Sequence, residues 1–178
     1  FKITLQQFKP EIWRRIQIAD GTLGDLHDAI QIAMGWNNCH LHHFVVGEDY
    51  YGTVFNDGLG GPETIDERSV RISDLFGMKD KLRVCQYEYD FGDGWQHKIA
   101  LEKQLPGVAG QHYPVCLEGE NACPPEDIGG VWGYADFLEA IKNPKHERYK
   151  EYRGWIGGRF DPAKFNHAGV NKILKKMQ

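Results

Sequence analysis

Two short segments of the chain combine acidic side chains with residues that favour tight turns. Residues 90–97 read Asp-Phe-Gly-Asp-Gly-Trp-Gln-His, and residues 123–130 read Cys-Pro-Pro-Glu-Asp-Ile-Gly-Gly. Carboxylate oxygens together with one imidazole nitrogen are ligands that suit magnesium, manganese or zinc. If the second segment folds over the first, the two segments together form a site for a divalent metal.

In a metal-dependent hydrolase or nuclease, these residues would have distinct roles. Asp90, Asp93 and Glu126 are the expected metal ligands, because a bound ion lowers the pKa of a coordinated water. His97 or Asp127 is the expected general base that takes the proton from that water. The structural alternative is that the acidic residues bond nearby backbone groups and the histidine has an ordinary hydrogen-bond partner in the core.

Three histidines lie within four residues, at His40, His42 and His43. Side chains of a strand alternate between its two faces, so His42 and Phe44 should share one face while His43 points to the other. These histidines are therefore poor joint ligands of a single ion. His27, beside the apolar stripe of the preceding helix, is the residue that could approach them.

The four cysteines lie at positions 39, 85, 116 and 123. They are too few and too scattered for a disulfide framework, so we expect reduced thiols. Cys116 and Cys123 share a loop rich in proline and glycine with His112, and these three side chains would make a partial zinc site without an evident fourth ligand.

Charge is distributed unevenly along a chain whose net charge is −4. Residues 142–178 hold ten Lys or Arg against three acids, whereas residues 1–141 hold eleven against twenty-two. A basic C-terminal region predicts a surface for nucleic acid or for a protein partner. The phosphate contacts would come from six side chains: Arg148, Arg153, Arg159, Lys172, Lys175 and Lys176. The alternative is ordinary solubilising charge on exposed helices.

These segments need regular elements to position them. Apolar and polar residues alternate in residues 1–8 and 12–18, which predicts an N-terminal hairpin. Thr22 is placed to cap a helix with an apolar stripe, and Gly35 is placed to end it. Four further strands are expected at residues 41–46, 50–54, 82–89 and 95–101, the last two forming a hairpin across residues 91–94.

Long loops and helices complete the expected fold. Residues 56–68 and 112–133 are rich in glycine, and predict loops. Residues 134–141 and 165–177 carry apolar stripes at helical spacing. With 41% hydrophobic residues for one core, the sequence predicts a single α+β domain over residues 1–178: a mainly antiparallel sheet with an N-terminal hairpin, one early helix and a helical C-terminal segment.

The sequence has no run of apolar residues long enough to span a membrane, so we expect a cytoplasmic protein.

Several familiar catalytic patterns are absent. The sequence has no glycine-rich phosphate loop followed by Lys-Ser or Lys-Thr, no dinucleotide fingerprint, no nucleophile elbow and no Cys-x-x-Cys pair. Its two serines, Ser69 and Ser73, leave little material for a serine nucleophile. Whether the protein is an enzyme therefore depends on the acidic segments.

A family resemblance rests on several long motifs in a fixed order. They are Pro10–Arg15, Leu26-His27, Gly35-Trp36 with His40-Leu41-His42-x-Phe44, Tyr89–His97, and Cys123–Gly130 with Gly133-Tyr134. In these motifs the chain resembles the family named after the third open reading frame of a root-inducing plasmid. The resemblance implies a compact α+β fold and an association with mobile genetic elements.

Some members of that family are labelled as passenger or resolvase-like proteins of transposable elements. A serine recombinase needs an activated serine beside several arginines, and Arg68-Ser69-x-Arg71 is too slight a match. We therefore expect a binding module that contacts nucleic acid or a protein through its basic C-terminal helices. A divalent-metal-dependent hydrolase and a scaffold with no site are the alternatives, and an exposed patch formed by Trp13, Trp36 and Trp132 would favour nucleic acid.

Overall fold

The N-terminal hairpin and the first helix form as the sequence predicts. In the computed structural model, which describes residues 1–54, 63–77 and 79–177, β1 (Lys2–Leu5) pairs antiparallel with β2 (Trp13–Gln17). Helix α1 (Leu23–Met34) follows. The Thr22 hydroxyl accepts a hydrogen bond from the Asp25 backbone N–H, and Gly35 ends the helix with a left-handed φ of 96° that glycine adopts without strain.

One eight-stranded sheet organises the molecule, with the strand order β5-β4-β3-β6-β7-β1-β2-β8. The other strands are β3 (His42–Val46), β4 (Asp49–Gly52), β5 (Thr64–Asp66), β6 (Val84–Tyr89), β7 (Trp95–Ala100) and β8 (Val115–Glu120). Neighbouring strands are antiparallel except β4 and β5, which are parallel. The predicted mainly antiparallel α+β fold is therefore confirmed.

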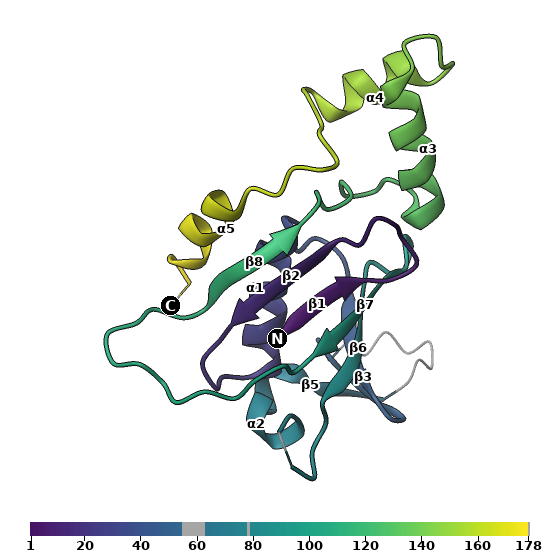
Figure 1. The fold of residues 1–178 in the computed structure, drawn as a ribbon. Coiled ribbons are helices and arrows are strands. Elements are labelled where there is room, and N and C mark those ends of the chain that lie inside the picture. The colour runs from purple at the N-terminus through teal and green to yellow at the C-terminus, as the bar shows by residue number, and fades with distance from the viewer. Residues whose placement is uncertain (55–62, 78, 178) are drawn as a thin grey trace.

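The helices flank this sheet in separate groups. Helix α1 lies behind the strands in Figure 1, and α5 (His167–Leu174) runs beside β8 and also contacts α1. The short elements η1 (Glu67–Ser69) and α2 (Ile72–Leu75) lie toward the β5 end. None of the helices in the described part of the chain is long and apolar enough to cross a membrane.

Helices α3 (Gly130–Lys142) and α4 (Tyr149–Ile156) form an arm that extends from the sheet in Figure 1. Aromatic rings hold this α3–α4 arm together, because Phe137 on α3 packs edge-on against Tyr152 and Trp155 of α4. Phe8 in the β1–β2 connection packs against Tyr134 on α3, at a centroid distance of 4.8 Å. This contact joins the arm to the sheet.

The structure corrects the two predicted long loops. Strand β8 occupies part of the predicted loop at residues 112–133. In the predicted loop at residues 56–68, β5 and the start of η1 occupy residues 64–68, while residues 56–62 lie outside the described residues. In β8, Gly119 resembles a loop residue, yet a Cβ there would lie 2.7 Å from the Phe165 ring and 2.8 Å from Arg14. The glycine therefore permits close packing of an edge strand. Helix α4 is also an element that the apolar pattern did not predict.

Candidate metal site at the meeting of three loops

Three loops from distant parts of the sequence meet at one end of the sheet. They are residues 35–41 between α1 and β3, residues 90–94 between β6 and β7, and residues 121–129 between β8 and α3. The Trp36 indole N–H donates to the Pro124 carbonyl at 3.1 Å, which joins the first loop to the third. The Gly129 N–H donates to Asp93 Oδ2 at 3.1 Å, which joins the third loop to the second.

His40 lies at the centre of this junction. Its Nε2 atom is 3.1 Å from Asp127 Oδ1, 3.6 Å from Asp90 Oδ2 and 3.9 Å from Glu126 Oε2. That nitrogen is buried, and no hydrogen-bond partner within the described residues satisfies it. The Asp127 oxygen, although near, does not lie in the hydrogen-bonding direction of the ring nitrogen.

These separations match those between ligands of one metal ion. Two ligand atoms about 2.1 Å from an ion lie about 3.0 Å apart at a right angle and about 3.4 Å apart at the tetrahedral angle. The distances from His40 Nε2 to Asp127 and Asp90 are close to these values, and the ligand atoms of the three residues all lie within 4.8 Å of one another. The arrangement can hold a divalent cation.

Backbone and side-chain donors fix the carboxylates. Asp90 Oδ1 accepts the N–H groups of Gly92 at 3.0 Å and Asp93 at 3.3 Å, which leaves Oδ2 directed toward His40. Glu126 Oε1 accepts the Asn37 N–H at 2.7 Å and the Tyr89 hydroxyl at 3.1 Å. Such outer partners orient metal ligands in proteins.

The charges of this cluster are poorly balanced. Asp90 is buried, and the Glu126 side chain is only 13% exposed, whereas that of Asp127 is 69% exposed. Within the ranges that the structure describes, no Lys or Arg lies within ion-pair distance of these three carboxylates. Close carboxylates without a cation repel each other, so a bound divalent ion would stabilise the cluster.

Three of the five predicted site residues come together at this junction: Asp90, Glu126 and Asp127. Neither group of potential ligands in the described chain includes Asp93 or His97. Asp93 instead joins the turn to the third loop, as described above. Asp93 and His97 therefore lie outside both groups of potential ligands in the described residues.

His97 faces inward as predicted and is completely buried. Its Nδ1–H donates to the Tyr87 carbonyl at 3.3 Å, and its ring meets the Trp36 ring edge-on at a centroid distance of 5.2 Å. Burial lowers the pKa of His97 to about 4. The imidazole is therefore neutral and surrounded by aromatic rings.

The sequence reasoning missed His40 as a member of the site. Strand geometry was applied to His40, His42 and His43 together, although His40 precedes both the predicted strand at residues 41–46 and β3, which begins at His42. His42 and Phe44 are buried on one face while His43 is half-buried on the other, as predicted. The Gly-Trp-Asn-Asn sequence before His40 favours a loop, and this signal could have separated it from the strand.

A second polar network lies next to this site. The His27 and His42 rings stack at a centroid distance of 3.4 Å, and His42 Nε2 is 2.9 Å from the buried carboxylate of Glu67. Burial, and next the charge of His42, lower the pKa of His27 to about 4. His42 and Glu67 line a cavity of about 600 Å³ whose wall also includes Cys39 and His40, so the junction borders an open space.

The six predicted phosphate contacts fall into two groups. Lys172, Lys175 and Lys176 are exposed on or just after α5, whereas the three arginines lie at the start of α4, within it and after it. Arg148 is paired with Asp136 at 2.6 Å and Glu151 at 3.0 Å. The helices therefore do not bring all six cations onto one element.

Other candidates from the sequence have separate surroundings. All four cysteines are free thiols, and His112 Nε2 donates to the Leu174 carbonyl at 3.1 Å. Burial raises the pKa of the Cys116 and Cys123 thiols. Trp13 and Trp36 are core residues, while Trp132 is 86% exposed, so the three do not form an exposed patch.

The fold and the site together define an α+β protein in which a histidine and three carboxylates meet at the loops of one antiparallel sheet. The chain belongs to the family of plasmid pRiA4b ORF-3-like proteins, whose sequence profile matches residues 1–169. This match confirms the family resemblance read from the motifs.

Two relatives span nearly the same length. The uncharacterized protein y4hQ of Sinorhizobium fredii (strain NBRC 101917 / NGR234) is 40% identical over 176 residues, which cover 97% of this chain and 88% of that protein. The crystal structure of MM3350, a protein of unknown function from Methanosarcina mazei Go1, is similar with a TM-score of 0.83 and 40% identity, covering 94% of this chain and 93% of that one.

Proposed function

We propose that this protein binds a divalent cation through His40, Asp90 and Asp127, and that it uses the ion to activate water for hydrolysis. The observation that carries the proposal is the buried His40 Nε2 atom, which faces three carboxylate oxygens but has no hydrogen-bond partner in the described chain. A buried imidazole nitrogen that has no hydrogen-bond partner and lies near several carboxylate oxygens is an arrangement that a cation would satisfy.

The surroundings of the cluster support a catalytic role. Three protein ligands leave coordination positions for water, and a coordinated water reaches a pKa of about 7 on a suitable ion. Glu126 is the nearest further carboxylate, and Tyr89 and Asn37 fix its orientation. We assign Glu126 as the group that accepts the proton from the water. The cavity beside His40 provides room for a substrate.

Metal titration of the purified protein tests the binding step. We expect one Mn²⁺ or Zn²⁺ per chain by elemental analysis and calorimetry. The unfolding free energy should rise by about 2.7 kcal/mol when the free ion is at one hundred times its Kd. His40→Ala should abolish both effects. His146→Ala is the matched control, because that ring lies beside Asp136 on the α3–α4 arm rather than in the junction.

The hydrolytic step has a separate test. Glu126→Gln should keep a bound Mn²⁺ but reduce manganese-dependent turnover of model phosphodiesters and esters by about 100-fold or more, the usual contribution of a proton acceptor. Absence of a stoichiometric ion from the wild-type protein would overturn the whole proposal. An ion without any hydrolysis in such a screen, or equal turnover by Glu126→Gln, would remove the assignment of Glu126 and of hydrolysis.

A further inference from the structure

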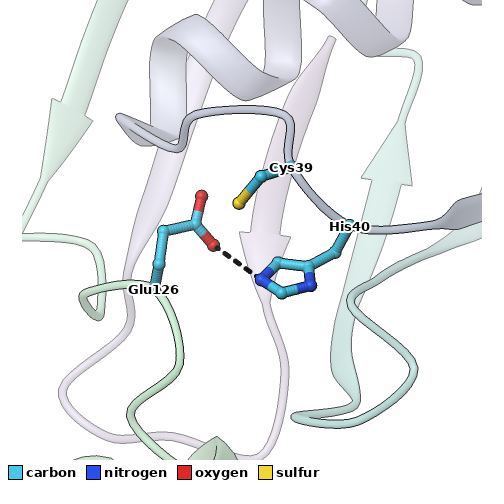
Figure 2. Close-up of side chains that lie close together, drawn as sticks. All are labelled: Cys39, His40 and Glu126. Atoms are coloured by element: carbon cyan, nitrogen blue, oxygen red, sulfur yellow. Dashed lines mark ion pairs between the residues drawn. The ribbon is translucent and has the colours of Figure 1, made fainter.

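We propose that Cys39 gives this site a second, sulfur-containing coordination mode that takes zinc-class ions in preference to magnesium or manganese. The inference rests on the proposed function, because it uses the same His40 nitrogen. In this mode the ligands are Cys39, His40 and Glu126, which Figure 2 shows converging from the first and third loops. Cys39 is thus a residue that determines which metal the site prefers.

Two possible ligand groups meet at His40. The ligand atoms of Cys39, His40 and Glu126 all lie within 4.8 Å of one another, and so do those of His40, Asp90 and Asp127. The two groups share only the imidazole. One imidazole nitrogen binds one ion, so the two modes exclude each other and the ligand chemistry decides between them.

The donor atoms of the two groups differ in the ions that they favour. Thiolate and imidazole favour zinc and similar ions, whereas a group dominated by carboxylates favours magnesium or manganese. Coordination by Cys39 replaces its S–H bond with a sulfur–metal bond and releases the proton to solvent. The carboxylate mode has no thiol proton to release.

The position of Cys39 suits a ligand better than a core residue. Cys39 is exposed, whereas Cys85 and Cys116 are buried, and burial raises the pKa of Cys85 to about 12. Cys39 Sγ lies 3.8 Å from the Tyr89 hydroxyl, and the Cys39 N–H donates to that same hydroxyl at 3.2 Å. Since Tyr89 also bonds Glu126, one phenol orients both the cysteine and the carboxylate.

Cobalt(II) provides the direct test, because a thiolate ligand produces an intense charge-transfer band in the near ultraviolet. The wild-type protein titrated with Co²⁺ should show this band, and Cys39→Ser should bind the ion without it. Cys39→Ser should also lower zinc affinity at least about tenfold while leaving manganese affinity unchanged. Asp127→Asn is the reciprocal variant: it should weaken manganese binding and keep the cobalt–thiolate band.

The outcomes separate this inference from the proposed function. If cobalt binds to the wild-type protein without a charge-transfer band, or if zinc affinity is unchanged in Cys39→Ser, the sulfur mode is wrong and the carboxylate site stands. If Mn²⁺, Zn²⁺ and Co²⁺ all fail to bind the folded wild-type protein, both proposals fall. Circular dichroism of each variant verifies that a lost band reflects a lost ligand rather than unfolding.

Discussion

His97 and His40 are imidazoles of the same molecule in opposite electrostatic surroundings. His97 lies among aromatic rings and bonds a carbonyl, which can only accept, so the proton is on Nδ1. His40 faces carboxylates at the edge of a cavity. Burial disfavours the charged form of the first ring, whereas negative groups surround the second. The two histidines therefore have different consequences for stability and for binding.

Protonation of His97 should destabilise the fold. Its pKa is about 4 in the folded protein against an ordinary value of 6.5, so the unfolded chain binds the proton more readily at intermediate pH. The stability is present above pH 6.5 and is lost as pH falls from there through about 4. Between about pH 7 and pH 5 this one group should cost about 2 kcal/mol.

His97→Asn checks this expectation, because asparagine can keep a donor near Nδ1 but does not titrate. Urea unfolding at the two pH values should give a smaller pH dependence for the variant than for the wild-type protein. An equal dependence in both proteins would show that other groups, such as His27, account for the acid sensitivity.

Local sequence predicts part of the site and misses part of it. Asp90, Glu126 and Asp127 could be recognised because each lies in a segment that combines acids with glycine or proline. His40 could not be placed, since its role depends on loops far apart in the chain that meet only in the folded molecule. Spacing along a strand describes neighbours in sequence and carries no information on such long-range meetings.

The third loop depends on backbone conformations that few residues adopt. Asp127, Gly129 and Gly130 all have positive φ, at 55°, 91° and 68°. A Cβ on Gly130, the first residue of α3, would lie 2.5 Å from the Asp93 carbonyl oxygen, so only glycine there lets the end of the third loop approach the β6–β7 turn. Loop conformation thus sets the distance between Asp127 and Asp90.

Gly130→Ala should lower the unfolding free energy by roughly 1–3 kcal/mol through strain alone, with the steric clash adding to it. It should also weaken metal binding, because the third loop must move away from the turn. Gly158→Ala is the matched control: a Cβ there has no atom within 4 Å, and its φ is not in the left-handed region. Denaturant unfolding and calorimetric metal titration measure both effects, and equal behaviour of the two variants would contradict this account.

The elements with strong local patterns were predictable from the sequence. Helix α1 carries a capping residue, an apolar stripe and a terminal glycine, and the β6–β7 hairpin has an alternating pattern on both sides of a turn. Strand β8 lies at the edge of the sheet and contains two glutamates and a glycine. Its conformation depends on tertiary contacts with β2 and α5. Its polar composition is therefore a poor local signal.

Charge across the molecule bears on the expected nucleic-acid contacts. Arg148 is neutralised by two acids on the arm, while the described structure gives Lys172, Lys175 and Lys176 no ion pair. Binding of nucleic acid through the C-terminal helices stays a prediction. If it occurs, the α5 lysines rather than Arg148 should supply its electrostatic part.

Fluorescence anisotropy with a labelled DNA duplex measures this contribution. Binding should weaken steeply as salt rises, because phosphate contacts release counterions. Replacing Lys172, Lys175 and Lys176 with Gln should weaken binding. It should also reduce the slope of the logarithm of affinity against the logarithm of salt concentration by the amount expected for about three phosphate contacts, whereas Arg148→Gln should change little. No binding at low salt, or an equal loss in both variants, would contradict the prediction.

The junction of the three loops has a consequence for how the molecule opens. Asp127 lies just before the α3–α4 arm, while His40 and Asp90 belong to loops of the sheet. An ion held by all three side chains would act as a reversible cross-link. It would close two loops of the chain, one between residues 40 and 90 and the other between residues 90 and 127. Cross-links of this kind restrict the unfolded chain and oppose local opening. The concentration of free metal would then set how often the arm detaches from the sheet.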